Sequence, residues 1–504
     1  CQVTSAELNS TVHIQGWGHM SNNIIFESAT ELAEQIKNKK LSSLELTQAY
    51  IDQIEKHDEK INAVPVRRFE QALREAKEAD EDLAKGELRG PLHGVPMTIK
   101  ESYVMKDTPS TWGDIAHKDN FSDKDGLIVS RFKSAGAHFL GKTNVPLDLA
   151  DFQSYNEIYG TTNNPWNLDH TPGGSSGGSA AATAAGFSGL EAGSDIGGSV
   201  RTPAHYSGVY GLKPTWGIVP MAGHEIIEGV PDADVSVCGP LARSAEDLAL
   251  ALSIMAGPTE RESVGWSLNL AEKDITSLKD FRVVLWPTDD LAPASQETQE
   301  RVHAIGDTLS KLGAKVSDTA RPEFDIRKSH DNYLSLTNAV MSSAKSPAVV
   351  EKIQEIVENL DPEDGSPEAV NARAAVMLHR DWIRHDFRRE KFRRAWDEFF
   401  KDWDIVVCPQ STAPAIKHDH RPWAERSMTV DGEERPYGEH IFWAGLPNNT
   451  YLPSTCFPTG LSKDGLPIGI QAFSPSYRDY RTIEFARLIT QEMGGFEAPE
   501  WLKA

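Results

Sequence analysis

The 504-residue sequence is short of cysteine and of positive charge. It has four cysteines and no CxxC pair, which argues against a disulfide scaffold and against a cysteine-bound zinc ion. Lys and Arg number 51, whereas Asp and Glu number 74, so the formal net charge is −23. Nucleic acid and anionic membrane surfaces attract clustered basic charge, so this balance disfavours both as partners.

Long hydrophobic runs are also missing. The longest stretch of small apolar residues, Ser179–Gly189, is shorter than the roughly 20 residues that a membrane-spanning helix needs. We therefore expect a cytoplasmic protein, either a monomer or a homodimer. A lipoprotein or a secreted form stays open, because the sequence begins with Cys1.

The composition is that of a folded protein, with 39% hydrophobic and 25% charged residues. Hydrophobic periodicity is missing at the start, so residues 1–22 are predicted to be a leader, disordered or non-native. Residues 23–504 are predicted to form one domain. It has N-terminal helices at 23–88, a core at 89–260, and a C-terminal part at 261–504 that completes a β-sheet and carries a helical insertion.

Local patterns predict the main elements. The capping boxes Ser28–Glu31 and Ser42–Glu45 open helices that run to about residues 40 and 57. A strand at 281–286, a helix at 296–312 and a strand from residue 314 make a predicted βαβ unit. Residues 370–403 predict one long helix. Because helices and strands alternate along the chain, we predict an α/β fold with helices on both faces of a sheet.

The densest feature is the glycine- and serine-rich block Thr171–Gly211. A flexible linker explains it poorly, because an alanine-rich helical pattern interrupts it. Gly197 and Gly198 precede Ser199, which would place a serine on a sharp turn beside free backbone N–H groups, as a nucleophile needs. The G-x-S-x-G elbow is absent there, and no histidine stands in a recognisable catalytic pattern.

A serine nucleophile needs a base, and one candidate for it stands at the end of a predicted strand. Lys100 ends an apolar run, where burial would favour its neutral, basic form. A lysine whose stem lies along the surface and whose charge reaches water fits the same pattern equally well. The residues alone leave both interpretations open.

Three segments together resemble the amidase signature family: Gly173–Ser179, Gly193–Arg201 and Gly211–Thr215. Further segments fit the same family: Gly90–Pro96 leading to Lys100, Gly141–Asn144, Asn164–Trp166, Gly239–Ser244 and Gly465–Gly469. The resemblance runs from about residue 24 to the C-terminus. It implies the family's fold, a large mixed and twisted β-sheet flanked by helices on both faces, and the activity of an amidase.

The resemblance also implies a Ser-cisSer-Lys triad. Lys100 matches the family's catalytic lysine, Ser175 its cis-serine and Ser199 its nucleophile. The spacing of the two serines agrees with the family and selects Ser175 over the neighbouring Ser176. A cis peptide bond is implied between Gly174 and Ser175.

In the implied mechanism, neutral Lys100 accepts a proton through the Ser175 hydroxyl while Ser199 attacks an amide carbonyl. Four backbone N–H groups would stabilise the oxyanion, those of Ile196, Gly197, Gly198 and Ser199. An acyl-enzyme forms and water hydrolyses it. The expected partner is therefore a small-molecule amide substrate, and neither a metal nor an organic cofactor is needed.

Other residues receive supporting roles. Three polar residues are expected around the triad: Ser176, Asp195 and Arg201. Asp195 and Arg201 suit fixing the serine turn better than catalysis. Three aromatic residues are candidates for the wall of the substrate pocket: Phe152, Tyr155 and Trp443. A position in the hydrophobic core explains each of these aromatic residues equally well.

Two alternative functions compete with this interpretation. Gly136–Thr143 matches the P-loop pattern G-x-x-x-x-G-K-[ST], but its apolar, strand-like interior argues against a phosphate loop. The stronger alternative is the glutaminase A subunit of a tRNA-dependent amidotransferase. The stretch Asp232–Pro240, and Trp216 where a tyrosine is expected after Gly211–Thr215, favour a stand-alone amidase. Esters, anilides and carbamates stay open as further substrates.

Overall fold

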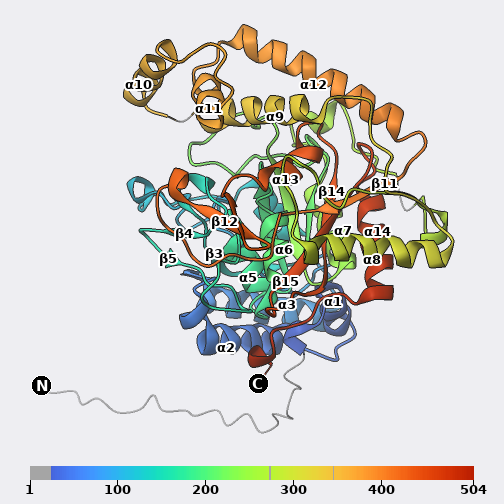
Figure 1. The fold of residues 1–504 in the computed structure, drawn as a ribbon. Coiled ribbons are helices and arrows are strands. Elements are labelled where there is room, and N and C mark those ends of the chain that lie inside the picture. Colours follow the sequence, from blue (N-terminus) through green and yellow to red (C-terminus); the bar gives the residue numbers. More distant parts are fainter. Residues whose placement is uncertain (1–23, 272–273, 344, 504) are drawn as a thin grey trace, which may run out of the picture.

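The computed structural model describes residues 24–271, 274–343 and 345–503. The predicted leader at residues 1–22 lies outside this part of the chain. Figure 1 shows N-terminal helices at the bottom, a central body of strands and helices, and a group of long helices at the top. None of the helices in the described part is long and apolar enough to cross a membrane.

An eight-stranded mixed sheet forms the centre of the molecule. In spatial order its strands are β10 (Lys315–Ser317), β9 (Arg282–Leu285), β11 (Ile405–Pro409), β15 (Pro467–Phe473), β14 (Ser454–Leu461), β7 (Tyr210–Lys213), β8 (Val237–Ala242) and β6 (Leu190–Asp195). The first three strands run parallel, and every later neighbouring pair is antiparallel. The sheet is therefore mixed, which confirms the predicted fold class.

Both faces of the sheet are covered, because successive residues of a strand point to opposite sides. In β11, Ile405 and Val407 pack in the largest hydrophobic cluster of the described chain. Val406 and Cys408 point the other way and pack in a second cluster with Trp396. A strand that is apolar at every position is typical of a sheet buried on both sides.

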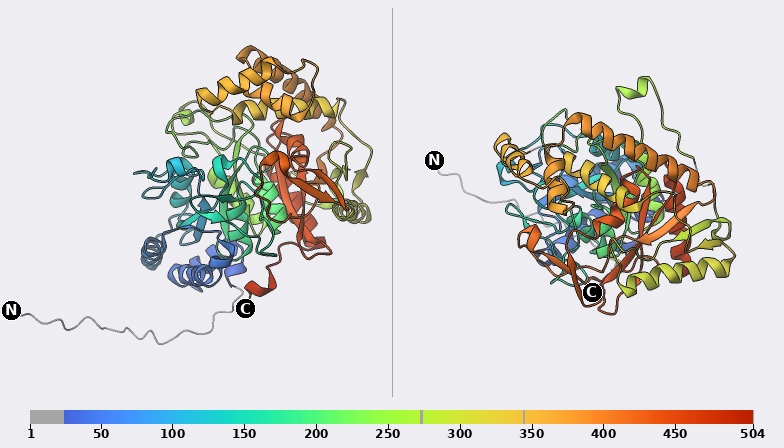
Figure 2. Two further views of the ribbon diagram at one scale, coloured as in Figure 1. Left: turned by 60° about the vertical axis from the view of Figure 1, so that its left-hand side comes forward. Right: turned by 45° about the horizontal axis from the view of Figure 1, so that its top comes forward.

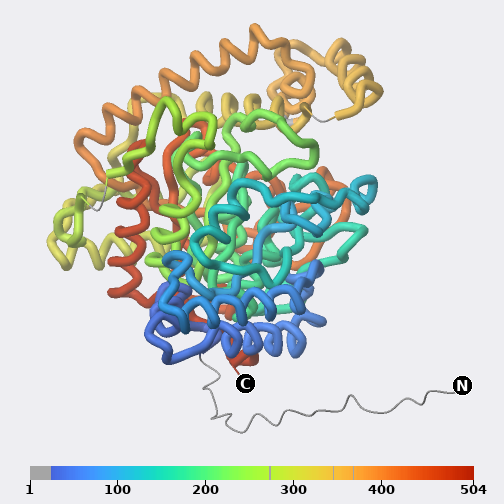
Figure 3. The backbone as a smooth tube through the Cα atoms, turned by 180° about the vertical axis from the view of Figure 1, so that it is seen from behind, coloured from blue at the N-terminus to red at the C-terminus, as the bar shows by residue number. Residues whose placement is uncertain are grey.

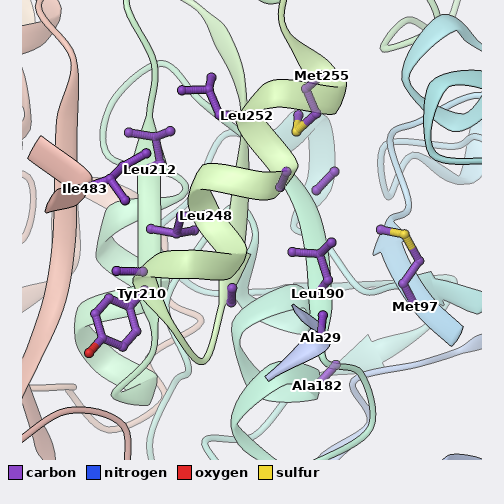
Figure 4. Packing of buried hydrophobic residues seen from close by; sticks show 14 of the residues in the cluster. Ala29, Met97, Ala182, Leu190, Tyr210, Leu212, Leu248, Leu252, Met255 and Ile483 are labelled. Atoms are coloured by element: carbon purple, nitrogen blue, oxygen red, sulfur yellow. The ribbon is translucent and has the colours of Figure 1, made fainter. Parts of the chain in front are cut away.

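One face of the sheet packs against α7 (Ala245–Met255) and α14 (Asp479–Met493). Figure 4 shows Leu248 and Leu252 of α7 in the same cluster as Leu212 of β7 and Ile483 of α14. Complete burial of one such side chain stabilises the fold by ~1.5–3 kcal/mol. This layer is therefore a main source of the free energy of unfolding.

A separate sheet has the strand order β1 (Val66–Arg67), β3 (His138–Thr143) and β2 (Pro96–Lys100). The end of the P-loop pattern, Gly141–Thr143, is part of β3 and is buried. A Cβ atom at Gly141 would lie 2.1 Å from the Val66 carbonyl oxygen. Lys142 is fully buried, and its Nζ donates to Ser110 Oγ at 2.9 Å inside the protein. The structure therefore contradicts the P-loop NTPase alternative.

The N-terminal layer consists of α1 (Ala29–Lys37), α2 (Ser43–Ile61) and α3 (Phe69–Lys85). It lies at the bottom of Figure 1 and again in the rear view of Figure 3. Both capping boxes are present: Ser28 and Ser42 accept the backbone N–H three residues on, and Glu31 and Glu45 bond back to the caps. Both helix starts were therefore predictable.

Four helices form the helical cap at the top of Figure 1 and of the left view of Figure 2: α9 (Ile326–Met341), α10 (Pro347–Glu358), α11 (Pro367–Ala375) and α12 (His379–Phe399). The prediction of one helix at 370–403 is wrong, since α11 ends at Ala375 and α12 begins at His379. Neither glycine nor proline marks this break. α11 and α12 both pack against α9, a tertiary arrangement that the local sequence pattern does not show.

The remaining helices and strands of the described chain complete the body: α4 (Leu127–Ser134), α5 (Gly177–Ala184), α6 (Arg201–Ser207), α8 (Gln296–Leu312), α13 (Ile441–Asn448), β4 (Tyr155–Asn156), β5 (Gly160–Thr161), β12 (Ser427–Val430) and β13 (Glu433–Pro436). α8 connects β9 to the parallel strand β10, which confirms the predicted βαβ unit. α5 and α6 each begin two residues after a serine of the predicted triad, Ser175 and Ser199.

Candidate active site

Lys100 is the last residue of β2, and its side chain is fully buried. Its Nζ donates to Ser175 Oγ at 2.7 Å and to Ser194 Oγ at 2.9 Å. The amine therefore faces hydroxyl groups inside the protein. The structure excludes the alternative in which the charge of this lysine reaches water.

Burial sets the protonation of Lys100. Desolvation disfavours the ammonium form and lowers the pKa of Lys100 to about 7, while Cys238, Asp195 and Glu191 act in the opposite direction. An ordinary lysine, with a pKa of about 10.4, is almost wholly protonated at neutral pH. Burial therefore makes the neutral amine, which can accept a proton, far more accessible near neutral pH than in an ordinary lysine.

Ser199 lies in the turn between β6 and α6. Gly198 has a φ of 106°, and a Cβ atom there would lie 2.8 Å from Thr202 Oγ1, so the turn requires glycine at this position. Ser199 is only 5% exposed. Its carbonyl accepts the Ser176 N–H at 3.1 Å, which joins the two serine-bearing segments.

Asp195 and Arg201 hold this turn together. The Asp195 carboxylate accepts the backbone N–H groups of Gly198 at 2.9 Å and Val200 at 3.1 Å. Arg201 Nη2 pairs with Asp195 Oδ1 at 3.0 Å, and both side chains are fully buried. Burial by itself raises the pKa of Asp195, but the Arg201 charge and these hydrogen bonds outweigh it and hold the pKa well below its usual range.

The Ile196 carbonyl is fixed from the helical cap and from α13. The Tyr333 hydroxyl donates to it at 2.8 Å, and Asn448 Nδ2 donates to it at 2.7 Å. Because a peptide unit is planar, fixing this carbonyl also fixes the direction of the Gly197 N–H. A donor held in place before the reaction stabilises developing charge without a cost of reorganisation.

The four predicted oxyanion donors differ in what they bind. The Gly198 N–H is engaged inside the turn by Asp195 at 2.9 Å. Within the described residues, the N–H groups of Ile196, Gly197 and Ser199 meet no hydrogen-bond acceptor of the protein. The geometry therefore favours these three over Gly198 for an incoming oxygen.

The second serine-bearing segment is anchored through Ser176. The peptide bond between Gly174 and Ser175 is cis, as the resemblance implies. Ser176 Oγ donates to the Ser194 carbonyl and accepts the Ser194 N–H, both at 3.3 Å. A Cβ atom at Gly193 would lie 2.6 Å from Ser176 Oγ, so this close approach depends on glycine. Ser176 thus ties the start of α5 to β6.

Two predicted pocket residues, Phe152 and Tyr155, differ in what they contact. A Cβ atom at Gly174 would come within 2.8 Å of the Phe152 carbonyl carbon, so the two backbones are in contact. Tyr155 stacks on His420 with ring centroids 3.8 Å apart, and Arg426 Nη2 donates to its hydroxyl at 2.8 Å. The backbone of Phe152 therefore contacts the cis-serine segment, whereas these contacts of Tyr155 are with His420 and Arg426.

Trp443 occupies a different environment. It lies in α13 and is fully buried. Its indole N–H donates to the Ala292 carbonyl at 3.0 Å, and its ring packs on Phe442 with centroids 5.1 Å apart. These contacts give Trp443 the core position that the sequence offered as the alternative to a pocket wall.

Four residues of the site were not predicted: Ser194, Tyr333, Asn448 and Gln471. Ser194 stands inside the Gly193–Arg201 motif, so the sequence offered a signal for it. Gln471 accepts Arg201 Nη1 at 2.8 Å from the far end of the chain. It reaches the site only through strand pairing, and Tyr333 and Asn448 only through helix packing.

Comparison with known proteins shows the family of the chain. Residues 45–483 match the family model described as Amidase. The chain is 30% identical over 475 residues to indoleacetamide hydrolase of Bradyrhizobium diazoefficiens, covering 93% of this chain and 86% of the relative. It is 30% identical over 482 residues to the A subunit of glutamyl-tRNA(Gln) amidotransferase of Alkaliphilus metalliredigens, and this match covers 91% of this chain and 95% of the relative.

Among solved structures, a bacterial aryl acylamidase described as an amidase signature enzyme has a TM-score of 0.76. The two chains are 25% identical over 92% of this chain and 96% of the other. The protein is therefore an enzyme of the amidase class, a hydrolase that acts on amides. It belongs to the amidase signature family.

Proposed function

We propose that the protein cleaves the C–N bond of small carboxylic amides through Ser199, Ser175 and Lys100, by way of an acyl-enzyme. The observation that carries this proposal is the buried Lys100 amine, with its lowered pKa, 2.7 Å from Ser175 Oγ. A buried neutral amine within hydrogen-bond reach of a hydroxyl is what a proton relay requires.

The proposed reaction has two halves. Ser199 Oγ bonds to the substrate carbonyl carbon, its proton passes to Ser175, and the Ser175 proton passes to Lys100. The oxyanion rests on the N–H groups of Ile196, Gly197 and Ser199, and removal of one such donor typically costs ~10²–10³ in kcat. The C–N bond then breaks as the proton returns through Ser175 to the leaving nitrogen. Water cleaves the resulting ester by the same proton route and regenerates Ser199.

Amides that carry an aromatic ring, on the acyl side or on the amine side, are the first substrates to test. Relatives named for indoleacetamide and for aryl acylamides support this choice. Phe152 is the proposed wall of the acyl site, because its backbone lies against Gly174. A hydrolysis panel of anilides, primary amides, glutamine, carbamates and esters separates these classes by kcat/KM.

The nucleophile is tested with a fluorophosphonate probe and mass spectrometry. We expect one covalent label, on Ser199, and loss of both label and activity in Ser199→Ala. Ser207→Ala is the matched control, since Ser207 lies in the helix that follows the turn and its hydroxyl donates to the Pro172 carbonyl. A folded Ser199→Ala protein that keeps its amidase activity would refute the assignment.

A second candidate function is the glutaminase A subunit of a tRNA-dependent amidotransferase. The relative from Alkaliphilus metalliredigens supports it, because the match covers 95% of that protein. Trp216 and the stretch Asp232–Pro240 favour a stand-alone enzyme. Glutamine hydrolysis that appears only with the other amidotransferase proteins and tRNA would decide for the second candidate.

A further inference from the structure

A cleft of about 470 Å³ lies on a part of the molecule that contributes no residue to the serine–lysine site. Its volume is within the range of ~300–1,000 Å³ that small-molecule sites usually have. Five lining residues carry the argument: Trp216, Trp266, Arg393, Tyr451 and Tyr477. Trp216 is the residue that stands where the family resemblance leads one to expect tyrosine.

Trp216 and Tyr451 form a preformed aromatic wall. Their rings stack with centroids 4.5 Å apart and planes 15° apart. The Trp216 indole N–H donates to the Ala233 carbonyl at 3.2 Å, and the Tyr451 hydroxyl donates to Asp234. Because both rings are already fixed, a ligand ring that packs on them loses little of its binding energy to ordering the protein.

Two further aromatic side chains of the cleft are exposed to solvent. Trp266 is 43% exposed and Tyr477 is 54% exposed. The backbone of Tyr477 is fixed, since its N–H donates to Thr215 Oγ1 at 2.9 Å and Thr215 Oγ1 donates to Asp479 at 2.7 Å. A flat ring in the cleft would remove this apolar surface from water.

Arg393 supplies the charge of the cleft. Its guanidinium lies 5.3 Å from the Tyr451 ring, pairs with Glu390 at 3.1 Å, and keeps a side-chain exposure of 38%. Arg389 also lies against this ring, but its side chain is 2% exposed and already pairs with Asp234 and Asp386. Since a guanidinium has five N–H donors, Arg393 can bind a second carboxylate in addition to Glu390.

We propose that this cleft binds a small aromatic carboxylate, with its ring against Trp216 and its carboxylate on Arg393. Aromatic walls and one accessible guanidinium recognise a flat ring and a planar anion together. The carboxylates of Glu390, Asp234 and Asp386 are each engaged by an arginine side chain, which offsets their repulsion of an anion. The proposal is independent of the mechanism proposed for Ser199.

The test is calorimetric titration of the protein with 2-naphthoate, a carboxylate that amide hydrolysis does not consume. We expect one site, with a Kd that rises about tenfold or more in Arg393→Gln and by a similar factor in Trp266→Ala. The matched control is Arg394→Gln, because Arg394 pairs with the same Glu390 at 3.0 Å, is 78% exposed and does not line the cleft. Its Kd should equal that of the wild type.

A second titration uses uncharged 2-naphthol in place of 2-naphthoate. It should bind more weakly than 2-naphthoate to the wild type and should bind the wild type and Arg393→Gln equally. Absence of 2-naphthoate binding to the wild type would overturn the proposal. So would a Kd that neither Arg393→Gln nor Trp266→Ala changes, which would place the binding elsewhere, including at the serine–lysine site.

Discussion

At the scale of a single residue, the burial of the Lys100 amine among hydroxyl groups lowers its pKa. Its Nζ has two serine acceptors at 2.7 and 2.9 Å. The apolar pattern before Lys100 allowed either a buried base or a surface lysine, because the sequence does not show which elements pack over the end of a strand. The three-dimensional structure decided between them through complete burial.

The pH profile follows from this residue. Burial lowers the pKa of Lys100 to about 7, and only the neutral amine accepts a proton, so kcat/KM should rise with pH through about 7 and then level off. Arginine stays protonated, so Lys100→Arg should lower kcat/KM by ~10²–10⁴. The measurement uses an amide that does not ionise between pH 5 and 9. A profile without a rise in this range would contradict the role of Lys100.

Ser194 offers a second test at the same scale. It is one of two acceptors for Lys100 Nζ, and a hydrogen bond stabilises the charged amine more than the neutral one. Ser194→Ala should therefore shift the acid limb of the kcat/KM profile to lower pH. Ser194→Thr keeps the hydroxyl and should restore the wild-type profile. Identical acid limbs in all three proteins would show that Ser194 does not act through Lys100.

At the scale of elements, the turn from β6 into α6 is held by contacts from distant segments. Asp195 binds two N–H groups of the turn, while Tyr333 and Asn448 bind the Ile196 carbonyl. The glycines of this turn were visible in the sequence. Which elements lie against them was not, because α9 and α13 are far away along the chain.

The turn is tested by replacing its left-handed glycine. Gly198→Ala should abolish most activity, because the new Cβ would lie 2.8 Å from Thr202 Oγ1 and 3.0 Å from Gln410 Nε2 at a φ of 106°. Gly217→Ala is the matched control, with a φ of 84° and no atom within 4 Å of its Cβ position. Both variants carry a similar backbone strain of ~1–2 kcal/mol, so unfolding and kcat are measured together. Equal kcat values for the two variants would contradict the proposed importance of the turn.

At the scale of the whole molecule, the sheet buries ionisable groups that face no solvent. Glu191 lies in β6 and is fully buried. Burial raises the pKa of Glu191 from 4.5 to about 8, although the hydroxyls of Thr98, Ser179 and Thr143 oppose the shift. The folded protein thus binds a proton that the unfolded chain releases in this window, so this group lowers stability as the pH rises from about 4.5 to 8.

Glu191→Gln should remove that loss of stability. The free energy of unfolding of the variant should exceed that of the wild type by a few kcal/mol at pH 8.5, and the difference should shrink toward pH 5. Urea unfolding at the two pH values measures it. Glu355→Gln, which changes an exposed residue of α10, should leave stability unchanged at both. A difference that does not depend on pH would show that Glu191 is not protonated in the fold.

Features that depend on neighbouring residues can be read from the amino-acid sequence alone. Helix starts at Ser28 and Ser42 follow from local hydrogen bonds, and the spacing of Ser175 and Ser199 is a property of the chain. Features that depend on contacts between distant segments arise only when the chain folds. The helices on either side of the break after Ala375 both pack against α9, and Trp443 packs in a hydrophobic cluster with its indole N–H bonded to Ala292. The lowered pKa of Lys100 belongs to the same group, because desolvation exists only once the sheets and helices have closed around the amine.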